Sequence, residues 1–438
     1  MFRLSERLFV IALVLISMHV VSGITNTAVK ETDNAIVSTE LHPYEDISQI
    51  GLYVWCATLI LRRRRKTLPA IRAAWPFMLL TVLSIVSMAW SVNPVMTLRR
   101  AGFLLLSTLT AVYLGERYTV DEFAQLLADS LIIIMLASIV AFFVAPQIAL
   151  DPSHIGQWRG IVGHKNSFGE SMGIAVVLMS LVRFRRNRWA QPFFFCMAFV
   201  LLLLSHSATA AGVAVIVLCS SPFWGVARLK VNQRVIAYTV CTILAVAVAV
   251  FIYLRSDLFL ALLGKDSTLT GRSDLWRLVM NAISKRPFLG YGYEAFWEGY
   301  KGESRAIILE SGWLVPMAHN GYLELGLSLG LAGFAAFLFA SFKYVQLAME
   351  YIRYERRPIA YWPMAYFCFF TIHNLAESTL LTRTTFQFLF FVVIATSLQQ
   401  GRQRRMQEGY ALAEHSRHLK FENTGNAVAA FSAGSTSA

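Results

Sequence analysis

The sequence predicts an all-α protein that crosses a membrane many times. Hydrophobic residues make up 56% of the 438-residue chain and charged residues only 15%, whereas a soluble protein carries about 25% charged residues. Apolar runs of roughly 20 residues, the length that spans a bilayer, recur along most of the chain. These two observations argue against a soluble fold, and no nucleic-acid partner is expected in spite of the net charge of +13.

The apolar runs predict about twelve transmembrane helices. In chain order they occupy residues 6–23, 47–61, 75–91, 99–115, 126–146, 167–183, 190–206, 208–226, 235–254, 320–341, 360–376 and 384–399. The first run is predicted to be a span and not a signal peptide, because no small-residue cleavage site follows it. The five cysteines lie inside these runs and are expected to be small buried residues.

The basic clusters between the runs predict the orientation. Short loops rich in Lys and Arg stay in the cytoplasm, and such clusters occupy residues 62–66, 183–188, 228–234, 353–357 and 401–405. Twelve spans that start from a cytoplasmic N-terminus place every one of these clusters on the cytoplasmic side, together with the C-terminus. Residues 98–100, "LRR", are the exception and fall on the outer side.

The chain is expected to have three regions. Residues 1–74 hold the first spans and a basic cytoplasmic loop, and residues 75–400 form the main membrane domain with its largest outer loop at about 255–319. Residues 401–438 are polar, rich in small residues and poor in aromatic residues, which predicts a disordered tail.

The largest outer loop is predicted to contain an amphipathic helix at residues 273–286. Leu275, Trp276 and Val279 share one face at spacings of three and four, and charged and polar side chains take the opposite face. We expect this helix to lie on the membrane surface with Trp276 at the interface.

Three outer residues carry charge that the orientation rule does not explain. Arg159 lies in a Gly-rich basic loop that continues through His164 and Lys165 into a span, Arg272 precedes the amphipathic helix, and His319 precedes span 320–341. Helix N-termini favour anions, and arginine adds a fork that matches phosphate. Two such places that face one cavity would clamp a diphosphate, whereas spacing alone favours the alternative that the arginines bind lipid headgroups or pair with nearby carboxylates.

His319 and Asn320 open the span 320–341. A histidine at a helix mouth can be a cap or an interface anchor, and it can also do chemistry. Asn320 and Glu324 share a face, whereas Glu324 points away from His319 and is a poor partner for the imidazole. The pattern GLSLG at 326–330 predicts that the span packs closely on a neighbour.

A second polar cluster occupies the outer end of span 360–376. Asn374, Glu377 and Arg383 can line the same cavity as His319, or they can form structural bonds between helices. No metal-ligand spacing, P-loop or dinucleotide fingerprint occurs in the sequence, so no metal and no cofactor are expected. An enzyme of this kind needs a substrate that arrives already activated, and a lipid-linked diphosphate fits.

The chain resembles the O-antigen ligase and polysaccharide polymerase superfamily of bacterial membrane glycosyltransferases. The resemblance rests on the blocks "RGIVGHKNSFGE" (159–170), "GRSDLWRL" (271–278), "GYGYEAFW" (290–297), "AHNGYLELGLSLG" (318–330) and "NLAESTLLTR" (374–383). Residues 90–100 and the "HKN" block are most similar to the branch that polymerises exopolysaccharides. The resemblance covers roughly residues 75–400.

The resemblance implies a metal-independent, GT-C-like, inverting glycosyl transfer on the periplasmic face of the bacterial inner membrane. His319 matches the catalytic histidine, and Arg159 and Arg272 match the arginines that bind the diphosphate; His164, Lys165, Asn320 and Arg383 are further candidates for substrate binding. The implied substrates are an undecaprenyl-diphosphate-linked oligosaccharide and a polysaccharide or lipid A-core acceptor. A chain-length-regulating membrane protein is an implied partner.

Three functions remain open at this stage. The first is a polymerase that joins lipid-linked repeat units, and the second is a ligase that differs only in its acceptor. The third is a transporter of lipid-linked sugars, against which stand the large outer loop and the lack of recognisable repeat halves or broken helices.

Overall fold

The computed structural model describes residues 2–20, 24, 43–152, 154, 156–184, 189–234, 272–382 and 385–409. These residues form helices and connecting loops without a β-strand, apart from one isolated bridge. The helices are α1 (Phe2–Ser17), α3 (Pro43–Arg62), α4 (Arg64–Ala73), α5 (Trp75–Val86), α6 (Pro94–Arg117), α7 (Val120–Val144), α8 (Pro146–Ala149), α9 (Lys165–Leu181), α10 (Ala190–Leu204), α11 (Ala208–Trp224), α14 (Arg272–Lys285), α15 (Ser304–Ser311), α16 (Gly321–Tyr354) and α17 (Trp362–His373). A last helix occupies residues 386–409.

The all-α prediction is confirmed for the described residues, and most predicted spans coincide with a helix. The predicted ninth span, 235–254, lies outside the described residues, as do residues 255–271 of the large loop and residues 410–438 of the tail. Residues 401–409, which the prediction assigned to the disordered tail, continue the last helix.

Four of the described helices are long and apolar enough to cross a membrane: α6, α7, α16, and α11 with its 3-10 extension to Arg228. A fifth span results if α4 and the segment Trp75–Trp90 are counted as one, although they are bent by 81°. The basic cluster at 62–66 lies at the end of α3 and the start of the short helix α4, which is bent sharply against the segment that follows it. The count of twelve spans stays a prediction.

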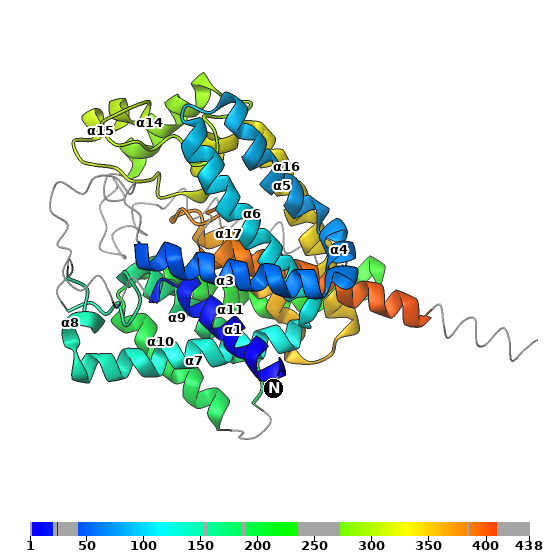
Figure 1. The fold of residues 1–438 in the computed structure, drawn as a ribbon. Coiled ribbons are helices and arrows are strands. Elements are labelled where there is room, and N and C mark those ends of the chain that lie inside the picture. The colour runs from blue at the N-terminus through cyan, green and yellow to red at the C-terminus, as the bar shows by residue number, and fades with distance from the viewer. Residues whose placement is uncertain are drawn as a thin grey trace, which may run out of the picture.

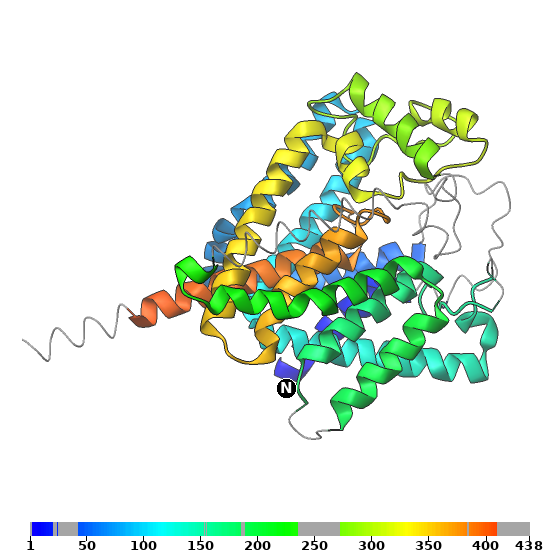
Figure 2. The same ribbon diagram turned by 180° about the vertical axis from the view of Figure 1, so that it is seen from behind.

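The helices are arranged as a bundle with a smaller helical cap at one end. In the bundle α9 packs on α10 and α11, α5 packs on α6 and α16, and α11 packs on α17. Both ribbon views place α14 and α15 together beyond the start of α16, far from the N-terminus (Figures 1 and 2). This cap has its own apolar core, which includes Leu275, Val279 and Ile308.

The predicted amphipathic helix exists as α14, but its apolar face is not turned to lipid. Leu275 and Val279 are buried at 2% and 0% exposure in the core of the cap. The Trp276 indole donates a hydrogen bond to the Ala318 carbonyl at 2.9 Å. The expected location of α14 on the membrane surface is therefore wrong, because periodicity shows only that one face is apolar and not what covers it.

Helix α16 is broken at Gly330, which has φ 56°. The backbone after α14 fills the break: Leu331 and Ala332 donate to the carbonyls of Pro287 and Phe288 at 2.8 and 3.1 Å. A Cβ on Gly330 would lie 2.6 Å from the Phe288 carbonyl carbon. The second glycine of the GLSLG pattern, Gly330, therefore allows α16 to pack closely against the backbone of a loop. The expectation of unbroken helices, used above against a transporter, is also wrong.

Candidate active site

Three segments that are far apart in the sequence meet at the end of the bundle that carries the cap. The Asn166 amide, in the first turn of α9, donates to the Glu377 carboxylate at 3.3 Å. The Arg272 guanidinium, at the start of α14, donates to the Ala376 carbonyl at 2.9 Å and lies 3.9 Å from the same Glu377 carboxylate. The turn at 376–377 thus brings the N-termini of α9 and α14 together, as a two-helix anion site requires.

His319 lies beside this junction with an imidazole that is poorly solvated. Its Nδ1 is buried and has no hydrogen-bond partner among the described residues. Burial, together with the nearby Arg272 and His164, lowers the pKa of His319 to about 4. These effects place His319, Arg272 and His164 in one electrostatic neighbourhood and keep the imidazole neutral at neutral pH.

The backbone at His319 is held in an unusual conformation. His319 has φ 50°, a left-handed value that few non-glycine residues adopt. The preceding residue, Ala318, is held on both sides, because its N–H donates to Glu324 and its carbonyl accepts from Trp276. The Trp313 ring stacks on the imidazole with centroids 6.3 Å apart. This strain is held by the surroundings and orients the imidazole, which is common at functional sites.

Asn320 acts as the cap of α16. Its side-chain oxygen accepts from the N–H groups of Tyr322 and Leu323 at 3.0 and 3.2 Å, and its amide donates to the Leu375 carbonyl. The Asn320 N–H donates to the Ser378 hydroxyl at 2.9 Å. These contacts tie the entrance of α16 to the 374–378 turn, and they favour a positioning role for Asn320 over substrate binding.

His164 and Lys165 begin α9 beside Asp151. The His164 Nδ1 accepts from the Asn166 N–H at 3.1 Å and caps the helix. The Lys165 N–H donates to Asp151 at 3.2 Å, and its ammonium group donates to Gln157 at 2.5 Å. The ammonium group is therefore anchored at the helix N-terminus, close to the site where an anion is expected.

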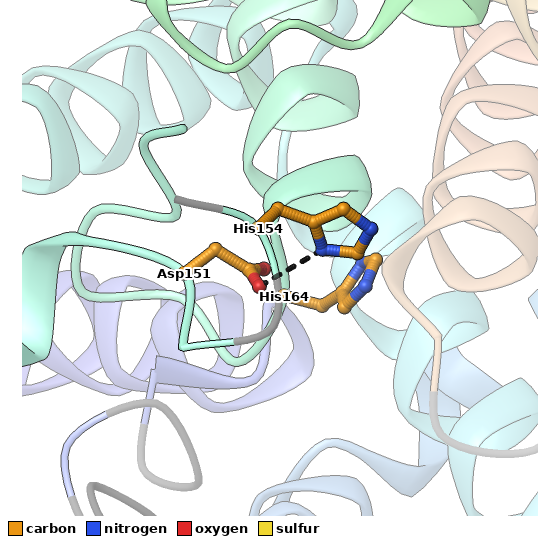
Figure 3. Close-up of side chains that lie close together, drawn as sticks. All are labelled: Asp151, His154 and His164. Atoms are coloured by element: carbon orange, nitrogen blue, oxygen red, sulfur yellow. Dashed lines mark hydrogen bonds and ion pairs between the residues drawn. The ribbon is translucent and has the colours of Figure 1, made fainter. Parts of the chain in front are cut away.

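Asp151, His154 and His164 form a cluster that the sequence reasoning missed (Figure 3). Their potential ligand atoms all lie within 4.8 Å of one another, and this donor set suits a transition metal. The contacts also explain the cluster without an ion, because His154 bonds to Asp151 at 3.1 Å and His164 caps α9. Spacings of three and ten residues in a loop gave no recognisable ligand motif.

Arg159 is 2% exposed, and its contacts lie within its own loop. The guanidinium donates to the carbonyls of Ile148, Gly163 and Gln147 at 3.0, 3.2 and 3.4 Å. Arg159 therefore binds the two ends of the loop that carries Asp151 and His164. Its contacts favour organising the site over direct contact with a phosphate, and Arg383 lies outside the described residues.

A cavity of about 210 Å³ adjoins the His319 turn on another side. Pro316, Met317 and Gly321, which bracket His319, line part of it. Its polar lining includes Arg100 from α6 and Glu294 from the outer loop, neither of which the sequence reasoning assigned to the site. The sequence did carry a signal for Arg100, because it belongs to the "LRR" segment that breaks the charge rule. In the structure the Arg100 guanidinium donates to the Glu294 carbonyl.

Comparison with known proteins adds the family to this geometry. Residues 192–338 match the O-antigen ligase family. The exopolysaccharide production protein ExoQ of Rhizobium meliloti (strain 1021) is 28% identical over 306 residues, which cover 66% of this chain and 68% of that protein. The chain is thus similar to O-antigen ligase-like membrane proteins. The two matches support a membrane glycan polymerase or ligase, and the matched family region contains Arg272 and His319.

Proposed function

We propose that this O-antigen ligase-like protein polymerises exopolysaccharide repeat units at the periplasmic face of the bacterial inner membrane, with both termini in the cytoplasm. The donor is a saccharide on undecaprenyl diphosphate, and the acceptor is a growing glycan. The observation that carries the proposal is the neutral, half-buried imidazole of His319, with its Nδ1 shielded from solvent, beside Arg272 and the N-terminus of α9. The similarity to an exopolysaccharide production protein favours polymerisation over ligation.

The cationic groups around Arg272 suit the departing diphosphate of a glycosyl transfer, and the imidazole of His319 suits the attacking hydroxyl. The diphosphate binds between Arg272 and the first turn of α9, where the Lys165 ammonium group and the helix dipole add positive potential. Arg159 holds the loop that presents His164 and Lys165. As the bond between the anomeric carbon and the phosphate oxygen breaks, these groups stabilise the charge that develops on the departing undecaprenyl diphosphate.

His319 acts as the general base in this mechanism. It takes the proton of the acceptor hydroxyl while the hydroxyl oxygen attacks the anomeric carbon from the side opposite the diphosphate, so that the configuration inverts. A positioned base contributes about 10²–10⁴-fold to such a step. Binding of the diphosphate offsets the positive charges that lower the pKa of His319, so donor binding makes the imidazole a stronger base.

The test uses purified protein in lipid with undecaprenyl-diphosphate-linked repeat units as the only saccharide. A ladder of products on a gel is expected from the wild type, with the rate reduced about 10²–10⁴-fold in His319→Ala. The matched control is His206→Ala, since His206 also has a left-handed φ, 51°, but lies between α10 and α11. Full activity of His319→Ala would remove the proposed base.

The same experiment separates the alternatives. Transfer that occurs only after a lipid A-core acceptor is added would identify a ligase. Absence of transfer with either acceptor, together with movement of lipid-linked sugar across the membrane, would identify a transporter. A chain-length-regulating membrane partner would change the distribution of chain lengths in the ladder without being needed for transfer.

A further inference from the structure

We propose that the cavity lined by Arg100, Glu294, Trp297, Glu324, Ser378 and Thr382 is a subsite for a neutral saccharide of the acceptor glycan. The inference rests on the proposed function, since it assigns the second substrate of the same site. The cavity has a volume of about 210 Å³.

The lining chemistry distinguishes this cavity from the diphosphate side. Two carboxylate groups, Glu294 and Glu324, face one guanidinium, Arg100, and hydroxyls come from Ser378 and Thr382. Such a lining disfavours a dianion and offers both donors and acceptors to sugar hydroxyls. A carboxylate accepts up to about four hydrogen bonds, so both glutamates keep acceptor capacity beside their present partners.

The polar groups are held in place before any ligand binds. The Trp297 indole donates to the Glu324 carboxylate at 3.0 Å, and the Glu294 N–H donates to the Ser328 hydroxyl at 3.3 Å. Trp297 is 7% exposed, so its indole is fixed in the wall of the cavity. A mostly apolar cavity with a few convergent polar groups is the usual form of a small-molecule site.

The cavity is connected to the candidate base through a single residue, Ala318. Glu324, which lines the cavity, accepts the N–H of Ala318, the residue before His319. Met317 and Gly321 line the same wall on either side of that turn. A saccharide in this cavity therefore lies on one side of the His319 turn, and the diphosphate between Arg272 and α9 lies on another.

The experiment measures binding of a saccharide that carries no diphosphate. The probe is the oligosaccharide that mild acid releases from the lipid-linked repeat unit, titrated calorimetrically into the full-length protein in nanodiscs. Glu294→Gln and Thr382→Val are expected to weaken binding about tenfold each, the usual effect of losing a hydrogen bond with a charged or well-positioned group. Glu377→Gln, the matched change on the diphosphate side, is expected to leave the affinity unchanged.

The outcomes keep the two proposals apart. Wild-type affinity in both Glu294→Gln and Thr382→Val, equal weakening by Glu377→Gln, or no binding by the wild type would overturn the subsite. His319→Ala is expected to bind the oligosaccharide normally while it fails to transfer. If the wild type showed no transfer with any acceptor but the cavity variants still weakened binding, the subsite would stand and the glycosyltransferase proposal would fall.

Discussion

The low pKa of His319 leads to an unusual dependence of rate on pH. A histidine with the ordinary pKa of about 6.5 is about 90% protonated at pH 5.5 and is lost as a base. With a pKa of about 4, His319 is only about 3% protonated at that pH. We therefore expect kcat/KM for the donor, which reports the free enzyme, to stay nearly constant between pH 7.5 and 5.5.

The sign of this effect follows from the surroundings. Burial, Arg272 and His164 all disfavour the imidazolium, whereas the Glu377 carboxylate is engaged by Arg272 and Asn166. A bound diphosphate adds negative charge and raises the pKa of His319. The acid limb of kcat, which reports the complex, should therefore lie at higher pH than the acid limb of kcat/KM.

The assay measures initial rates of transfer at limiting and at saturating donor from pH 5.0 to 8.0. Protein incubated at pH 5.5 and returned to pH 7.5 must recover its rate, which excludes acid unfolding. A loss of kcat/KM of about tenfold at pH 5.5, with a limb near the ordinary histidine pKa, would show that the buried, charge-depressed imidazole is not the base.

Three further predictions concern the groups around this site. Arg272→Lys should raise the KM for the lipid-linked donor about tenfold through loss of the guanidinium fork. The control Arg277→Lys, on the exposed side of α14 with 69% side-chain exposure, should leave that KM unchanged. Equal effects of the two variants would contradict a diphosphate contact at Arg272. Gly330→Ala should destabilise the protein by about 1–3 kcal/mol, seen as a lower melting temperature, whereas Gly102→Ala, with nothing within 4 Å of the new Cβ, should not. Removal of divalent ions with EDTA should leave the rate of transfer unchanged, since protein contacts account for the pairing of Asp151 with His154. If EDTA instead lowered the rate, and zinc restored it in the wild type but not in His154→Ala, a metal site would be established.

The positions of the helices were predictable because apolar runs of bilayer length leave little choice. The break in α16 was not, although both glycines of GLSLG were visible, because a left-handed Gly330 is stable only when loop residues 287–288 supply the backbone partners. In the same way, the period of α14 indicated an apolar face, but only the fold shows that the cap covers it. Local pattern determines the element, and distant contacts determine its surroundings.

The candidate site was predictable in part for a similar reason. His319 and Arg272 stood out because polar groups at the mouths of membrane helices are costly and need a reason. Glu377 could be named, but its link between Asn166 and Arg272 depends on three segments meeting. Glu294 gave no signal of its own, since an acidic residue in an outer loop is ordinary until a cavity and a buried arginine are placed beside it.

Arginines that break the charge rule need not bind substrate, as a comparison of Arg159, Arg100 and Arg272 shows. Arg159 is buried and donates to three loop carbonyls, so its charge serves the local fold. Arg100, at 8% exposure, lies against Glu294 and donates to its carbonyl, so its charge joins α6 to the outer loop. Arg272 keeps 28% of its side chain exposed and lies 3.9 Å from its carboxylate partner. Of the three it is the one whose charge an incoming anion can reach at little cost, which is why the diphosphate is assigned to Arg272 first.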